Sequence, residues 1–156
     1  MKPHKKVMTP EEEAASVARL ACACANVRRA SRVITQLYDA ELRASGFTIA
    51  QFGLLGAVAK LKISTQATLG TALSVDSTTL TRNLEPLLEN KWIEKIPGTD
   101  RRERYLQLTA LGRKQLKRAL PRWQRAQARL RRRLGPKDWD RLQALLAKAV
   151  EAAQGA

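Results

Sequence analysis

The chain has 156 residues, a length that suits one compact domain or two small intertwined subdomains. Its 29 Lys and Arg residues against 14 Asp and Glu residues give a formal net charge of +15, which favours a phosphate-bearing partner. A hydrophobic fraction of 44% is enough for a packed core and argues against a wholly disordered chain. The single histidine, His4, argues against a Ser-His-Asp or Cys-His catalytic site.

A membrane, a metal and a cofactor are not expected. The longest apolar run, Phe52 to Ala59, is far shorter than the roughly 20 residues that span a bilayer. We therefore expect a cytoplasmic protein. Cys22 and Cys24 lie two residues apart, on nearly opposite sides of a helix, where they cannot bridge each other. Two thiols and His4 also fall short of a four-ligand zinc site.

The N-terminal third of the chain predicts two helices, each opened by a capping box. The first box is Thr9 to Glu12, and it begins a long helix over roughly residues 10–44 that Gly46 ends. The second is Thr48 to Gln51, which begins a more apolar helix to about Leu61.

The middle of the chain predicts two short helices and a hairpin. Ser64 or Thr65 caps the first helix, residues 74–76 break it, and the second covers residues 77–90. Strand-like segments at 92–96 and 104–108 are joined by a polar loop. Two tight helices followed by a β-hairpin make a winged helix-turn-helix arrangement.

Two helices complete the chain. Thr109 caps a helix to about Leu134, with a kink or break expected at Pro121. Gly135 and Pro136 separate it from a final amphipathic helix through Val150. Ten Lys and Arg residues and no acid lie between residues 113 and 133, and we expect them to spread around the helix.

The helix over residues 77–90 has two faces. Leu80, Leu84 and Leu87 are expected to pack inward, and the opposite side carries Ser77, Thr78, Thr81, Arg82 and Glu85. Small hydroxyl side chains and an arginine suit a helix in a major groove, because arginine binds guanine O6 and N7 with two hydrogen bonds. The alternative is that Asp76 and Ser77 merely cap a solvated helix.

The loop of the hairpin carries arginines that could reach a second groove. Arg101, Arg102 and Arg104 cluster there, and an arginine can enter a narrow, electronegative minor groove. Taken alone, such a loop is most often solvated surface. Its position about twenty residues beyond a helix-turn-helix pattern makes it a candidate second contact.

These segments together resemble the MarR family of bacterial transcription regulators. The match runs from Leu69 to Arg82, through Leu87-Leu88-Glu89 and Trp92-Ile93, and from Pro97 to Gly112. The family usually has Gly where this chain has Lys91, so either Asn90 or Lys91 adopts the left-handed conformation, or the turn differs from that of the family. Pro86 should bend the same helix.

The resemblance implies a mainly α fold with a small β-hairpin wing. The winged helix-turn-helix core is expected at 46–112, and long dimerisation helices at 1–45 and 113–156. It also implies a homodimer on a palindromic operator in double-stranded DNA, released by a ligand or an oxidant. It places Ser77 to Arg82 in the major groove and Arg102, the arginine of Asp-x-Arg, at the wing tip. Together with the loop arginines noted above, the expected DNA contacts are Ser77, Thr78, Thr79, Thr81, Arg82, Arg101, Arg102 and Arg104.

The first helix also resembles that of the OhrR-type peroxide sensors within this family. Cys24, fourteen residues before Tyr38, falls at the position of their reactive cysteine, but the second tyrosine of their sensing trio is Ile49 here. Peroxide sensing through Cys24, with Tyr38 as partner, is therefore one alternative. The other is that both cysteines are small packing residues of the helix.

The leading hypothesis is a dimeric, sequence-specific repressor, not an enzyme. A small anionic or phenolic effector is one expected means of release, with Arg28, Arg29 and Arg32 as candidate anion contacts. The alternative from a different class is a basic helical protein that coats nucleic acid, or an anionic membrane, without sequence preference.

Overall fold

The computed structural model describes residues 8–18, 22–98 and 104–155, in two compact units, Met1–Leu37 and Tyr38–Ala156. In the first unit, α1 (Pro10–Ala18) begins on the predicted capping box. The Thr9 hydroxyl accepts the Glu12 N–H at 3.2 Å, and the Glu12 carboxylate accepts the Thr9 N–H at 2.9 Å.

The expectation of one continuous helix over residues 10–44 is wrong. Cys22 is not helical, and α2 (Ala23–Leu42) is a separate element. The Cys22 carbonyl accepts the Asn26 N–H at 3.1 Å, so Cys22 occupies the half-in position that precedes a helix. Only Cys24 therefore projects from α2, and the expectation that both thiols lie on one helix is wrong.

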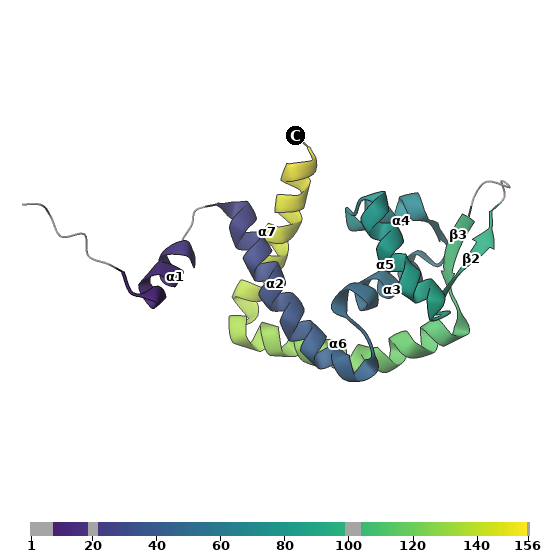
Figure 1. Cartoon of the computed structure of the whole chain (residues 1–156), viewed down its shortest axis with the longest axis horizontal. Coiled ribbons are helices and arrows are strands. Elements are labelled where there is room, and N and C mark those ends of the chain that lie inside the picture. Colours follow the sequence, from purple (N-terminus) through teal and green to yellow (C-terminus); the bar gives the residue numbers. More distant parts are fainter. Residues whose placement is uncertain (1–7, 19–21, 99–103, 156) are drawn as a thin grey trace, which may run out of the picture. The chain divides into compact units, whose positions relative to one another are not determined.

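Helix α3 (Ile49–Leu61) is the centre of the second unit. It follows a short 3₁₀ turn, η1 (Arg43–Ser45), and Gly46, whose φ of +77° ends that turn as predicted. The Thr48 and Gln51 capping box is confirmed. Four apolar side chains of α3 are buried: Phe52, Leu54, Leu55 and Val58. Because they lie on more than one side, α3 packs against both α5 and α6 and lies between them (Figure 1).

The helix-turn-helix consists of α4 (Gln66–Leu73) and α5 (Ser77–Glu89). Ser74 takes the left-handed conformation at φ +51° and ends α4, which confirms the predicted break. Leu80, Leu84 and Leu87 are buried, as the amphipathic pattern predicts.

The left-handed turn after α5 falls on Lys91. Lys91 has a φ of +56° where the family usually has Gly. The Lys91 N–H donates to the Leu88 carbonyl at 2.9 Å, a hydrogen bond that helps to hold this conformation.

The wing belongs to a three-stranded antiparallel sheet of order β1-β3-β2. Strands β2 (Ile93–Pro97) and β3 (Arg104–Leu108) pair with Ile93 opposite Leu108 and Pro97 opposite Arg104. Strand β1 (Ser64–Thr65) pairs with β3 and was not expected, because the same two residues read as a helix cap. Both assignments hold, since the Thr65 side chain also accepts the Thr68 N–H at the start of α4.

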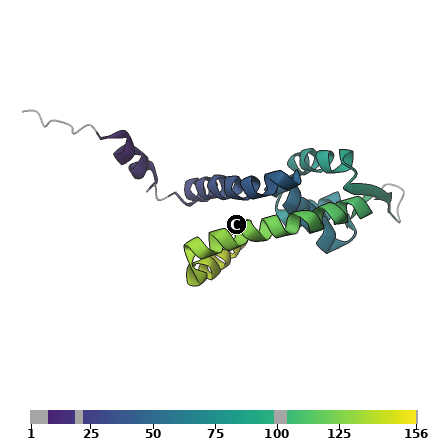
Figure 2. The same ribbon diagram turned by 90° about the horizontal axis from the view of Figure 1, so that it is seen from below.

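The C-terminal part is a pair of helices, α6 (Ala110–Leu134) and α7 (Pro136–Gln154). The predicted break at Pro121 is absent, and α6 continues through it (Figure 2). Pro121 and Lys117 are both exposed. The Lys117 carbonyl, which loses its N–H partner to the proline, can therefore be solvated.

A membrane-spanning helix needs both length and apolar character to cross a bilayer. Among the described residues, no single helix combines the length and the apolar character needed to cross one. The pair formed by 23–45 and 49–61 meets both criteria only when counted together, and it bends by 77°.

Gly112 fixes the start of α6 against the sheet. A Cβ at this position would lie 1.9 Å from the Trp92 carbonyl oxygen, far inside contact distance. The same carbonyl accepts the Thr109 N–H at 3.1 Å, and the Thr109 hydroxyl accepts the Gly112 N–H at 2.9 Å. The backbones of Trp92 and Gly112 are thus held too close together for any side chain.

We expect Gly112→Ala to lower the free energy of unfolding by about 1 to 3 kcal/mol, because the methyl group forces the two backbones apart. Urea denaturation measures this change. The matched control is Gly53→Ala in α3, where a Cβ meets nothing within 4 Å. That variant should be neutral or more stable by up to about 1 kcal/mol. Equal behaviour of the two variants would contradict the packing described here.

Candidate nucleic-acid interface

The first turn of α5 presents a capped helix start with exposed hydroxyl groups. The Asp76 carboxylate accepts the Thr79 N–H at 2.8 Å. Hydrogen bonds from the Thr79 backbone and side chain hold the pKa of the Asp76 carboxyl below its ordinary value of 3.8. Ser77 and Thr78 are exposed, whereas Thr79 is half-buried. Of these three predicted contacts, Ser77 and Thr78 are the accessible ones.

Thr81 is exposed, but its hydroxyl also links the two helices of the motif. It donates to the Ser77 carbonyl at 2.8 Å and accepts a hydrogen bond from the Gln66 amide at 2.6 Å. Gln66, the first residue of α4, was not singled out from the sequence. No local pattern could find this contact, because it spans fifteen residues and depends on how α4 and α5 cross.

Arg82 is the exposed cation of this surface. It forms no ion pair with any residue that the structure describes. It lies on the same side of α5 as Thr78, about 40° away around the helix and opposite the buried leucines, whereas Ser77 at the helix start is about 140° away. An exposed guanidinium that the fold does not engage keeps its donors for a ligand.

The wing supplies a further cation to this part of the unit. Strands β2 and β3 extend beyond the helices (Figure 1). Arg104 is the first residue of β3 and is exposed. Arg101 and Arg102 lie outside the described residues, so their place in the interface stays a prediction from the sequence.

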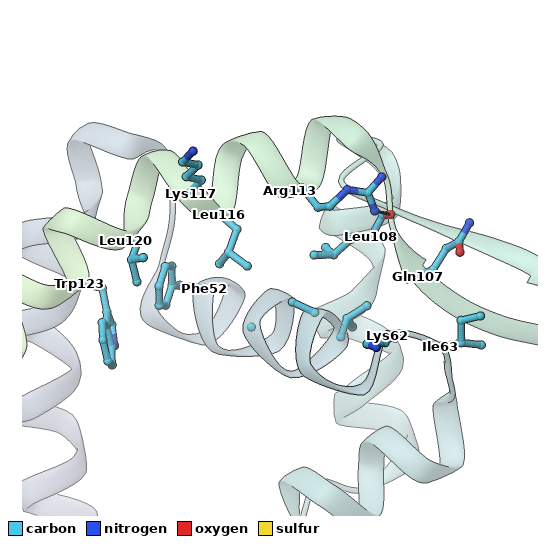
Figure 3. A pocket seen from close by; sticks show the side chains of 13 residues that line it. Phe52, Lys62, Ile63, Gln107, Leu108, Arg113, Leu116, Lys117, Leu120 and Trp123 are labelled. Carbon is cyan, nitrogen blue, oxygen red and sulfur yellow. Dashed lines mark hydrogen bonds between the residues drawn. The ribbon is translucent and has the colours of Figure 1, made fainter.

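A cavity of about 720 Å³ lies between parts of α3 and α6 (Figure 3). Its wall is mainly apolar, and at one end the Phe52 and Trp123 rings stack with their centroids 5.8 Å apart. Figure 3 shows Leu116 and Leu120 of α6 pointing toward α3.

The rim of this cavity is cationic. Arg113 donates to the Leu108 carbonyl at 2.7 Å. Lys62 lines the cavity at the same end as Arg113, away from Trp123 (Figure 3). Lys117 also lines the cavity but points away from α3 (Figure 3). The sequence did not indicate this site: Arg28, Arg29 and Arg32, the anion contacts considered there, are exposed residues of α2.

The two cysteines and Tyr38 have different surroundings. Cys22 and Cys24 are exposed and not in a disulfide. Tyr38 is buried, its hydroxyl donates to the Gln127 side-chain oxygen, and burial raises the pKa of the phenol. This hydrogen bond gives Tyr38 a role in joining α2 to α6. Peroxide sensing through Cys24 stays a prediction.

Solved structures of transcription regulators resemble this chain over most of its length. The M. tuberculosis regulator MosR, solved in complex with DNA, is 39% identical, with a TM-score of 0.78 over 86% of this chain and 97% of MosR. A mutant MarR of E. coli, solved in complex with operator DNA, is 25% identical, with a TM-score of 0.74 over 91% of this chain and 99% of MarR.

A curated relative gives a shorter match. An uncharacterised HTH-type transcriptional regulator of Bacillus subtilis, YwoH, is 28% identical over 83 residues. The match covers 53% of this chain and 61% of that relative, less than two thirds of its length. No family model matches the chain.

We expect Asp76→Ala to lower stability at neutral pH, because the Thr79 N–H loses its acceptor. A carboxyl with a lowered folded pKa stabilises the fold above its unfolded pKa, and this contribution is lost as the pH falls through the folded value. The difference in the free energy of unfolding between wild type and Asp76→Ala should therefore disappear in acid, at a pH below the ordinary pKa of 3.8. Urea denaturation over a pH series measures it.

Asp76→Ser is the control, since a serine caps without titrating. The difference in the free energy of unfolding between Asp76→Ser and Asp76→Ala should not depend on pH. A destabilisation by Asp76→Ala that persists unchanged in acid would show that the carboxylate is not the cap.

Proposed function

Because the chain belongs to the MarR family of transcription regulators, we propose that it is a repressor that binds a palindromic operator in double-stranded DNA as a homodimer. The observation that carries this proposal is the exposed face of α5. There Ser77, Thr78 and Arg82 stand on a helix that the Asp76 cap and the Gln66–Thr81 hydrogen bond hold in place.

In this proposal α5 enters the major groove and the wing follows the adjacent minor groove. Arg82 binds guanine with two hydrogen bonds, while Ser77 and Thr78 reach phosphates and base edges. Thr79 and Thr81 contribute mainly by keeping α5 in position. Arg101, Arg102 and Arg104 contact the minor groove, and Arg102 reads its width.

The proposed dimer joins helices at both ends of the chain, within 1–45 and 113–156, and leaves 46–112 to the operator. Helix α7 carries exposed apolar side chains on one side: Leu145, Leu146 and Val150, with exposed fractions of 55%, 41% and 49%. Val27 and Val33 of α2 are likewise exposed. Apolar faces of this kind mark association surfaces, and a second copy would bury them.

We expect Arg82→Ala to reduce the preference for the operator over random duplex by about 10-fold or more, as loss of a bidentate base contact costs about 1 to 3 kcal/mol. Arg102→Ala should weaken binding and relax the preference for a narrow minor groove. Competition binding at several salt concentrations, with an operator selected from random duplexes, measures both effects.

The control is Arg141→Ala in α7, which removes the same charge from an exposed site. It should leave the preference for the operator unchanged. If wild type shows no preference among duplexes, the basic coating protein becomes the better description. If both interface variants bind as wild type does, the proposed docking is wrong.

We further propose that a small aromatic anion releases the DNA by binding in the cavity between α3 and α6. The apolar wall with the Phe52 and Trp123 rings suits an aromatic ring, and the Arg113 and Lys62 side chains suit a carboxylate. Helix α3 packs against α5, so an occupied cavity can shift α5 and lower the affinity for DNA.

We expect 4-hydroxybenzoate to dissociate the DNA complex and its neutral analogue 4-hydroxybenzyl alcohol to do so far less. Arg113→Gln and Lys62→Gln should each raise the concentration needed by about tenfold, because a charged hydrogen bond is lost. Fluorescence anisotropy of labelled operator measures the release. Lys148→Gln in α7 is the control and should match wild type. Equal release from all three variants would exclude this cavity as the effector site.

A further inference from the structure

Seven of the ten cations of α6 lie along one side of the helix. Because α6 is not broken at Pro121, its residues keep one angular register of about 100° per residue. On that register seven of them fall within an arc of about 100°, so the expectation that they spread around the helix is wrong. We call these residues the α6 stripe: Lys114, Arg118, Arg122, Arg125, Arg129, Arg132 and Arg133.

The α6 stripe is an accessible row of positive charge. Lys114 and Arg118 are exposed, Arg122 is half-buried, and none of the three forms an ion pair within the described part of the chain. Arg125 and Arg129 lie 3.6 and 3.7 Å from the Glu41 carboxylate, in partly exposed pairs that neutralise little. Helix α6 itself contains no acidic residue, so the charges add along about 29 Å.

The stripe does not share the exposed face of α5. Helix α3 packs against both helices and lies between them. Packed helix axes are about 8 to 10 Å apart, and α5 and α6 each pack on α3. Leu116 and Leu120 of α6 point toward α3 (Figure 3), and the middle of the stripe lies about 150 to 170° around the helix from them. A duplex lying on α5 therefore leaves the stripe in solvent.

The charge pattern decides among the candidate partners. A second copy of the same stripe would be repelled. A membrane-surface helix needs an apolar face free for lipid, whereas Leu116, Ala119 and Trp123 of α6 pack against the core. Successive cations at Lys114, Arg118 and Arg122 are about 6 Å apart along the axis. A regular row of cations without acids is complementary to a nucleic-acid phosphate backbone.

We propose that the α6 stripe binds the phosphate backbone of a second segment of duplex DNA while α5 holds the operator, so that one dimer bridges two duplexes. The contact is sequence-independent, because the stripe meets only phosphates. This inference rests on the proposed function, since it requires an operator bound at α5.

The test is capture of a second duplex by the protein–operator complex. An operator selected from random duplexes is immobilised and saturated with full-length protein, and a labelled duplex of random sequence is added. Wild type should retain the labelled duplex at low salt. The triple variant Lys114→Gln, Arg118→Gln, Arg122→Gln should bind it at least about tenfold more weakly, with the log–log salt slope reduced by about 2 to 3.

The matched control is Lys137→Gln, Arg141→Gln, Lys148→Gln, which removes three exposed cations from one side of α7. It should capture the second duplex within about twofold of wild type. Circular dichroism confirms that both triple variants keep their helices, and both should still select the operator over random duplex.

The outcomes separate this inference from the function on which it rests. Lack of any preferred duplex overturns the proposed function. Operator binding without capture of a second duplex overturns the bridging proposal alone, and so does equal loss of capture in both triple variants. Retention of phosphatidylglycerol vesicles or of a polyglutamate peptide, in place of the second duplex, overturns it as well.

Discussion

The second unit depends on one constraint: helix α3 is apolar on more than one side and cannot face water. Each fully buried aliphatic or aromatic side chain contributes about 1.5 to 3 kcal/mol, and α3 buries Phe52, Leu54, Leu55 and Val58. Its neighbours α5, α6 and β3 must therefore cover it from different directions. This arrangement turns the polar face of α5 outward, and it leaves the α3–α6 cavity where the covering is incomplete.

Short-range capping then sets where each covering helix begins. Thr48, Thr65, Asp76 and Thr109 each accept an N–H from the first turn of the helix that follows. The capped start of α5 and the Gln66–Thr81 hydrogen bond belong to the fold and to the candidate interface at once. Substitutions there are expected to change stability and DNA binding together, whereas Arg82 can be changed with little effect on the fold.

The net charge of +15 is divided between surfaces with different surroundings. The face of α5 mixes one arginine with small hydroxyl groups, a composition suited to base recognition. The α6 stripe is a regular row of cations without an acid, suited only to a polyanion. In contrast, α7 interleaves its cations with Asp138, Asp140 and Glu151, which reduces the field along that helix. The exposed apolar residues of α7 thus lie on a less charged surface, where two copies can meet.

The sequence by itself determined the helix caps, the buried leucines of α5 and the two wing strands, because each depends on residues within a few positions along the chain. It left the position of the left-handed residue after α5 open between Asn90 and Lys91. It missed the break before Ala23, and the break that it allowed at Pro121 is absent because the Lys117 carbonyl can be solvated. Only the tertiary structure decided the pairing of β1 with β3, the Gln66–Thr81 hydrogen bond and the cavity between α3 and α6. These features join residues far apart in the chain, so they arise from how the helices pack around α3.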